Sequence, residues 1–279
     1  MERSSWLREL RRKEIIDPLR EDPRTRANPG TLLGWHPDRI FNVAIGMGQA
    51  DFDRSIEDLT GSDRARLYAY FNQKRHIDEL VHAFGLMVGD PLELRKATVI
   101  DIGCGPFTAG LALAEVLTAR TPFRYVGVDR ANSMCALGLQ LSRAAIAANA
   151  LHGDTSIEFR HDLDTCDFGP DCRNGWTVVV LSYLLASGSV EVNKLVASIV
   201  SAADRIGPGP VAVIHTNSAA SAANAKFAEL SKALTGAEFA TVVDEQEVFI
   251  HTDSSPKSLH YALFVRQRRV GLHSPKGVA

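Results

Sequence analysis

The first third of the chain carries apolar residues at helical spacing. From residue 62 to residue 89 they recur mostly three or four positions apart, as one face of a helix requires. The positions are Leu67, Tyr70, Phe71, Ile77, Leu80, Val81, Phe84 and Met87. Ser62 or Asp63 could cap the start of this helix, and Pro91 ends it because proline disfavours helical geometry in the preceding residue. We therefore expect one long amphipathic helix within a helical N-terminal region.

From about residue 97, short β-rich apolar runs alternate with helical segments. The runs are 98–103, 125–129, 157–162, 176–185 and 209–216. Strands that alternate with helices form parallel sheets through βαβ crossovers. Residues 238–252 and 258–269 are two further strand candidates with no helix between them, which indicates a terminal antiparallel hairpin.

Together these patterns predict an α/β fold. We expect a doubly wound, mostly parallel seven-stranded sheet with a C-terminal antiparallel hairpin and an N-terminal helical extension. The change of pattern places the boundary between the extension, residues 1–92, and the sheet domain, residues 93–279.

Composition narrows the classes of function. A formal net charge of −2 over 279 residues gives no global reason to bind nucleic acid or an anionic membrane. The cysteines, Cys104, Cys135, Cys166 and Cys172, have neither zinc-ribbon spacing nor the density of a disulfide scaffold, so we expect free thiols. Because the sequence has no apolar run of about 18 residues and no apolar signal segment, we expect a cytoplasmic protein without a membrane span.

The segment VIDIGCGPFTAG, residues 99–110, ends the first strand in a glycine turn. Gly103 and Gly105 let the backbone turn sharply, and free N–H groups at the start of the next helix favour an anionic group. Thr108 stands where the dinucleotide fingerprint needs a third small residue, which disfavours NAD and FAD. Asp101 could face a cationic group, so a zwitterion with an amine and a carboxylate fits this turn better than a pyrophosphate.

With these residues in place, the sequence from about 97 to 267 resembles the class I S-adenosylmethionine-dependent methyltransferases, whose first motif is an acidic residue followed by Gly-x-Gly. The resemblance implies S-adenosylmethionine as the cofactor. It also implies a role for each matching position: Asp101, Gly103, Cys104 and Gly105 at the methionine moiety, Asp129 with Arg130 at the ribose, Asp162 with Leu163 at the adenine, and Ser182 and Tyr183 where substrate and methyl donor meet.

Two residues are candidates for catalysis. His215 follows the fifth strand candidate, where a parallel sheet opens toward its ligand, and could act as a base. A strand-end histidine bonded to backbone or water is the alternative. Tyr183 could shape the acceptor pocket or place its ring beside the sulfonium, or it could be a core or lid residue. Asn217 could bond a substrate or cap the next helix.

The resemblance further implies that the N-terminal helices, residues 1–92, form a lid. Tyr70 and Lys74 lie four residues apart, hence on one helix face, and could close over the methionine end of the cofactor. Ordinary packing of Tyr70 with a solvated Lys74 is the alternative. His76 and His82 are six residues apart, which does not suit a shared helical metal site, so no metal is predicted.

These features predict a methyltransferase that transfers a methyl group to oxygen or nitrogen of a small-molecule acceptor by direct in-line displacement. The fourth strand is followed neither by the Asn/Asp-Pro-Pro-aromatic sequence of adenine methyltransferases nor by the Pro-Cys pair of cytosine C5 methylation. An RNA methyltransferase, suggested by the arginines near both ends, and an inactive binding subunit stay open as alternatives, as do the acceptor and the oligomeric state. Phe107 is expected on the first turn of the next helix, packed under or beside the cofactor without blocking it.

Overall fold

The computed structural model describes residues 4–87, 94–169, 175–250 and 257–267. Within these residues, seven strands form one sheet in the order β3-β2-β1-β4-β5-β7-β6. The first five strands are parallel, whereas β7 is antiparallel to both β5 and β6. The strands are β1 (Thr98–Ile102), β2 (Arg124–Val128), β3 (Ser156–Arg160), β4 (Thr177–Ser182), β5 (Val211–Ser218), β6 (Ala240–Phe249) and β7 (Lys257–Arg266). The predicted fold class and terminal hairpin are confirmed.

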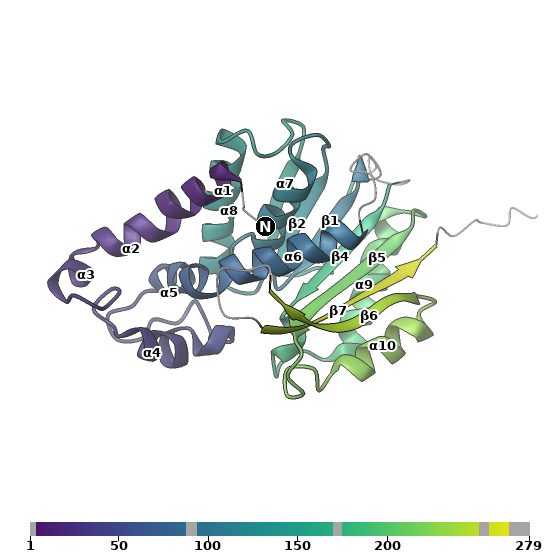
Figure 1. The fold of residues 1–279 in the computed structure, drawn as a ribbon. Helices are drawn as coiled ribbons and strands as arrows, with labels where there is room; N and C mark the ends of the chain where they lie inside the picture. Colours follow the sequence, from purple (N-terminus) through teal and green to yellow (C-terminus); the bar gives the residue numbers. More distant parts are fainter. Residues whose placement is uncertain (1–3, 88–93, 170–174, 251–256, 268–279) are drawn as a thin grey trace, which may run out of the picture.

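Helices flank the sheet and form the N-terminal third of the chain (Figure 1). They are α1 (Ser5–Arg11), η1 (Arg12–Ile16), α2 (Asp17–Glu21), α3 (Pro23–Ala27), α4 (Pro37–Arg39), η2 (Ile40–Ala44), η3 (Gly46–Gly48), α5 (Gly61–Tyr68), η4 (Ala69–Gln73), α6 (Lys74–Met87), α7 (Thr108–Leu117), α8 (Asn132–Ala147), η6 (Leu184–Ala186), α9 (Val192–Ile206) and α10 (Phe227–Gly236). In the described part of the chain, none of them combines the length and apolar content that crossing a membrane requires.

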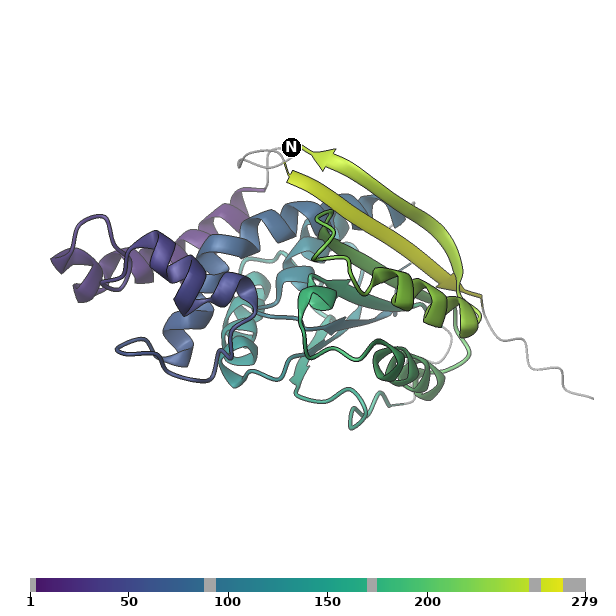
Figure 2. The same cartoon turned by 90° about the horizontal axis from the view of Figure 1, so that it is seen from below.

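Strand residues alternate between two hydrophobic clusters, one on each face of the sheet. Val99 and Val180 join the cluster that contains buried residues of α1, α6, α7 and α8. Ile100 and Leu181 join the cluster that contains buried residues of α9 and α10. Both faces are therefore covered, as a parallel sheet requires. Figure 2 shows α9 and α10 on the side of the sheet opposite to α6. The alternation also decides which side of the sheet each residue near a strand end faces.

The predicted long helix is present as the continuous run of α5, η4 and α6, from Gly61 to Met87. Its cap is Thr60 rather than Ser62 or Asp63. The Thr60 hydroxyl accepts a hydrogen bond from the Asp63 N–H at 3.1 Å, and the Asp63 carboxylate accepts one from the Thr60 N–H at 3.0 Å. This reciprocal pair is a capping box. The predicted end of the helix at Pro91 and the predicted boundary at residue 92 lie outside the described residues.

Candidate active site

The turn after β1 is bound to the turn after β2 through one carboxylate. Gly103 and Gly105 have φ of 71° and 51°, the left-handed region that glycine enters without a steric penalty. The Gly105 N–H donates to Asp129 Oδ2 at 3.0 Å, and the Ala131 N–H donates to Oδ1 at 2.9 Å. Burial raises the pKa of Asp129, although these two donors oppose the shift. The carboxylate is thereby fixed at the carboxyl ends of two neighbouring parallel strands.

A cavity of about 300 Å³ opens at this edge of the sheet, and we call it the strand-end cavity. That volume lies at the lower end of the range of about 300–1,000 Å³ for small-molecule sites. The carboxyl ends of four parallel strands and the segments that follow them supply Ile102, Gly103, Gly105, Val128, Asp129, Arg130, Ala131, Met134, His161, Ser182, Tyr183, Leu184, Ser187, Ser189 and Val190. The N-terminal region supplies Gly48, Gln49, Ala50, Phe52 and Tyr68. The structure thus brings together six predicted residues: Gly103, Gly105, Asp129, Arg130, Ser182 and Tyr183.

The N-terminal region closes one side of the strand-end cavity with aromatic rings. Phe52 and Tyr68 meet edge to face, with 5.5 Å between ring centroids. A Cβ atom on Gly48 would lie 3.3 Å from the Tyr68 ring, so glycine allows this segment to pack closely on the tyrosine. On the sheet side, the ring of Tyr183 stacks on His76 with 4.0 Å between centroids. The lining therefore combines aromatic walls with the carboxylate and backbone groups of the strand ends.

Asp101 and Cys104 belong to the first motif but do not line the cavity. Asp101 lies in β1, where alternation turns its side chain toward the α7 face of the sheet. Its carboxylate accepts a hydrogen bond from the Tyr125 hydroxyl at 2.6 Å, and burial raises its pKa to about 7. Cys104 is also buried, and its thiol lies beneath the glycine turn near Gly127. Neither side chain, although both are predicted at the methionine moiety, lines the strand-end cavity.

The predicted adenine residues, Asp162 and Leu163, are likewise not at the cavity. Asp162 accepts a hydrogen bond from the Asp164 N–H at 2.9 Å and is exposed. Leu163 is buried in the cluster beneath α9. The cavity is lined instead by His161, whose Nδ1 lies 2.9 Å from the Asp129 carbonyl oxygen. Because β3 ends at Arg160, His161 is the first residue of the turn, and this position is the signal that sequence analysis missed.

Tyr70 and Lys74 share a helix face, as predicted, but that face is turned away from the cavity. Tyr70 packs edge to face with Phe71 at 5.2 Å. Lys74 lies 3.3 Å from Asp78 and lines a different cavity of about 170 Å³ together with residues of α1. Tyr68 lines the strand-end cavity in their place. Two residues along a helix correspond to about 200° of rotation, so Tyr68 and Tyr70 point to opposite sides.

His215, the predicted base, does not line the strand-end cavity. His215 is fully buried within β5 and faces α10, where its ring centroid lies 5.1 Å from that of Phe227 and 5.5 Å from that of His260. Burial lowers its pKa to about 3. Asn217 is also buried and donates to the Ala223 carbonyl at 3.0 Å, so it is neither a cap nor a cavity residue. Parallel pairing with β4 reaches Thr216 and antiparallel pairing with β7 extends β5 to Ser218, so both residues lie inside the strand.

Phe107 lies outside the cavity lining. It is the N-cap of α7 rather than a residue of its first turn, with φ of 65°, and its side chain is fully buried. The ring packs edge to face against Tyr125, at 4.8 Å, and Phe159, at 6.1 Å. As expected, Phe107 does not block the cavity, because its ring is directed into the core.

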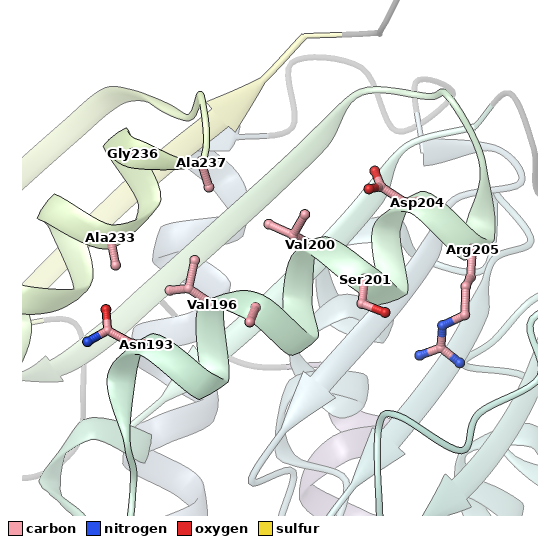
Figure 3. Close-up of a pocket in the computed structure, with 10 residues that line it drawn as sticks. Asn193, Val196, Val200, Ser201, Asp204, Arg205, Ala233, Gly236 and Ala237 are labelled. Atoms are coloured by element: carbon pink, nitrogen blue, oxygen red, sulfur yellow. The ribbon is translucent and has the colours of Figure 1, made fainter.

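A second hollow, of about 810 Å³, lies between the outer surfaces of α9 and α10 (Figure 3). Three of its polar side chains, Asn193, Asp204 and Arg205, bond to other groups of the protein. Asp204 pairs with Arg266 at 3.1 Å, Arg205 donates to the Leu163 carbonyl at 2.9 Å, and Asn193 donates to Glu229 at 3.1 Å. None of the residues that line this hollow lies at a strand end, so we place the candidate active site at the strand-end cavity.

The strand order decides the fold type. Five parallel strands in the order 3-2-1-4-5, followed by an antiparallel β7 inserted between β5 and β6, form the sheet that the glycine-turn resemblance implied. The fold is that of the class I methyltransferases. No protein-family model matches the sequence, and no curated protein matches it either.

Solved methyltransferase structures are similar to this chain at low identity. The magnesium protoporphyrin IX methyltransferase from Synechocystis, with bound SAM, is 14% identical, over 88% of this chain and 98% of that chain, with a TM-score of 0.47. The O-methyltransferase from Bacillus cereus, in complex with SAH, is 11% identical, over 82% and 90%, with a TM-score of 0.44. The O-methyltransferase TomG from Streptomyces achromogenes is 13% identical, over 82% and 99%, with a TM-score of 0.44.

Proposed function

We propose that this protein is an S-adenosylmethionine-dependent methyltransferase that acts on oxygen or nitrogen of a small-molecule acceptor. One observation carries the proposal: the strand-end cavity joins the left-handed glycine turn, the fixed Asp129 carboxylate and Tyr183 in one site. In α/β sheets, ligands bind outside the carboxyl ends of the strands, which is where this cavity lies.

The residues of the cavity fit such a cofactor. Gly103 and Gly105 both line the cavity and carry no side chain, so a ligand can approach the backbone closely there, while a Cβ atom on Gly103 would lie 2.9 Å from Leu184 Cδ1. Gly103 and Gly105 would hold the methionine part, Asp129 would accept hydrogen bonds from the ribose hydroxyls, and His161 with Arg130 would border the adenine. The cofactor supplies a methyl group on a positively charged sulfur. The protein's contribution is to hold the acceptor in line, which can lower the barrier by about 7–11 kcal/mol.

The form of the cavity favours a small acceptor. Phe52 and Tyr68 wall off one side, and the N-terminal segment 48–50 borders the opening. A nucleic acid needs several basic groups along its path, whereas Arg130 is the one arginine or lysine among the lining residues. An aromatic, partly enclosed cavity therefore supports a small-molecule substrate over a polynucleotide.

Replacing Asp129 by alanine is expected to weaken binding of S-adenosylmethionine and of its demethylated product by roughly 10- to 100-fold. Hydrogen bonds to a charged group contribute about 1.5–3 kcal/mol, and about 1.4 kcal/mol corresponds to a factor of ten. Isothermal titration calorimetry on folded protein measures the change. Asp162→Ala is the matched control, because this exposed aspartate lies outside the cavity and should leave the affinity unchanged. Absence of binding at millimolar ligand, or equal losses in both variants, would contradict the proposed site.

Tyr68→Ala should weaken binding in the same titration by roughly three- to tenfold, because an aromatic contact contributes about 0.5–1.5 kcal/mol beyond its buried area. Tyr70→Ala removes the same side chain two residues away and should bind the cofactor as the unmodified protein does. The opposite ranking would mean that the helix presents its other face to the ligand. Formation of the demethylated product over an acceptor panel then tests turnover, and binding without turnover would favour the inactive binding subunit.

A further inference from the structure

A buried carboxylate stands behind the wall of the strand-end cavity. Glu79, on α6, is 1% exposed. The hydroxyl of Tyr183, which follows β4 and lines the cavity, donates a hydrogen bond to Glu79 Oε1 at 3.2 Å. This bond joins two residues 104 positions apart in the sequence, and it connects the cavity to an acidic group that does not itself line it.

Packing alone does not account for this carboxylate. Arg75 Nε lies 3.4 Å from Oε1, while Oε2 is buried and has no hydrogen-bond partner among the described residues. Burying a charged or polar atom without a partner costs free energy. A glutamate kept under these conditions, with one oxygen on a cavity tyrosine, points to a role in that tyrosine's chemistry.

The tyrosine is held in one orientation. Its backbone has φ of 58°, and its ring stacks on His76 with an interplanar angle of 18°. His76 is 6% exposed, and burial lowers its pKa to about 3, so the imidazole is neutral near pH 7. Arg75 places a guanidinium nitrogen 3.1 Å from His76 Nε2 and its guanidinium carbon 5.5 Å from the centre of the Tyr183 ring. The phenol therefore keeps a fixed direction toward Glu79.

The charges around Glu79 set its proton affinity. Burial raises its pKa to about 7; Arg75 and the Tyr183 hydrogen bond oppose the shift, and Asp78 adds to it. Tyr68 faces the Tyr183–Glu79 pair from α5, and burial raises the pKa of Tyr68 and of Tyr183 above the usual range, so both phenols stay protonated. Near neutral pH, Glu79 is the group of this cluster that exchanges a proton readily.

We propose that Tyr183 and Glu79 form a proton-accepting pair for methyl transfer, in which Tyr183 meets the acceptor and Glu79 acts through Tyr183 as a positioning residue. The inference rests on the proposed function. As the acceptor oxygen or nitrogen forms its bond to the methyl carbon, the bond from that carbon to sulfur breaks. The acceptor's proton passes to the phenolic oxygen of Tyr183, while the phenolic proton passes to Oε1 of Glu79. Before the next cycle Glu79 returns that proton to the phenolic oxygen of Tyr183, and the proton that Tyr183 took from the acceptor leaves through the cavity to solvent, so no oxidant or reductant is required.

The test is the pH dependence of turnover in matched variants. In the unmodified protein, kcat is expected to rise roughly tenfold from pH 6 to pH 8, because Glu79 accepts a proton only when it is ionised. Glu79→Gln should lower kcat at pH 8 at least tenfold and remove the rise. Tyr183→Phe keeps the ring and its stacking on His76 and should give the same flat profile. Asp78→Asn, one residue away on α6 and paired with Lys74, should keep the rise but move it to lower pH, because Asp78 adds to the raised pKa of Glu79.

A second measurement does not depend on turnover. Infrared difference spectra between pH 6 and pH 8 should show buried carboxyl groups losing their protons, with contributions from Glu79 and from Asp101, whose pKa burial also raises to about 7. Glu79→Gln should lose one contribution and retain the other. An unchanged spectrum in Glu79→Gln, or a variant that keeps both its rate and its pH profile, would overturn the inference.

Cofactor calorimetry separates this inference from the proposed function. Glu79→Gln should bind S-adenosylmethionine with an affinity within about twofold of the unmodified protein, because Glu79 does not line the cavity. If the unmodified protein does not bind the cofactor, the proposed function fails and the proton-accepting pair fails with it. If binding is intact and the pH profile is the same in all variants, only the pair is refuted.

Discussion

Replacing Phe107 by alanine is expected to lower the free energy of unfolding by about 3–5 kcal/mol, the cost of removing a large aromatic side chain from a packed core. The ring is fully buried and meets Tyr125 and Phe159 edge to face. The ring packs directly on the backbone of Gly110, where a Cβ atom would lie 1.9 Å from it. No side chain at that position can move into the space that the ring leaves, so a cavity should persist.

Urea denaturation followed by fluorescence or circular dichroism measures this loss. Phe71→Ala is the matched control, because Phe71 is a partly exposed phenylalanine that packs on Tyr70, and its removal should cost clearly less. Equal losses for the two variants, or a loss below about 1 kcal/mol for Phe107→Ala, would show that the aromatic cluster closes over the gap. Either result would remove the structural reason for a phenylalanine in the glycine loop.

The sequence allows prediction of the sheet and of the cavity residues that strand ends determine. β-rich runs that alternate with helices predict parallel strands joined by βαβ crossovers. Gly103 and Gly105 take left-handed backbone angles, which suit the turn that ends β1. Asp129 follows β2 directly, so its position at the carboxyl edge of the sheet follows from the strand itself. The positions of these residues could be predicted because they do not depend on contacts between distant parts of the chain.

The misplaced residues depend on contacts that spacing cannot reveal. Sequence analysis places His215 at a strand end, but pairing with β4 on one side and with β7, more than forty residues later, on the other keeps it inside β5. Tyr70 and Tyr68 both suit an amphipathic helix, and only the packing of α1 on one side and of the glycine turn on the other distinguishes them. Arg75 and Glu79 have the four-residue spacing of many exposed helical ion pairs. Only the structure shows that Glu79 is buried and bonded to Tyr183.

His215→Leu is expected to make stability less sensitive to acid, by roughly 3 kcal/mol between pH 7 and pH 4. The folded-state pKa of His215 is about 3, against an ordinary value of 6.5, and burial is the largest cause. The unfolded chain therefore takes up a proton below pH 6.5 that the folded protein does not bind. Neutral His215 contributes fully above pH 6.5, and its contribution is lost as the pH falls toward 3. Leucine has no proton to gain, so the stability of the variant should fall less between pH 7 and pH 4 than that of the unmodified protein.

Only the difference between variants isolates this effect, because other buried groups shift the balance in both directions. His76, whose pKa burial also lowers to about 3, adds to the loss of stability in acid. Asp101 and Glu79, with pKa values raised to about 7, hold protons in the folded state. Their contribution to the stability of the protein therefore falls as the pH rises toward 7. Phe227→Leu is the control, since it loosens the contact with the His215 ring but keeps the titrating group. Urea denaturation at each pH gives the free energy of unfolding. Between pH 7 and pH 4 this free energy should fall by the same amount in Phe227→Leu as in the unmodified protein. If it also falls by the same amount in His215→Leu, the imidazole reaches water in the folded state.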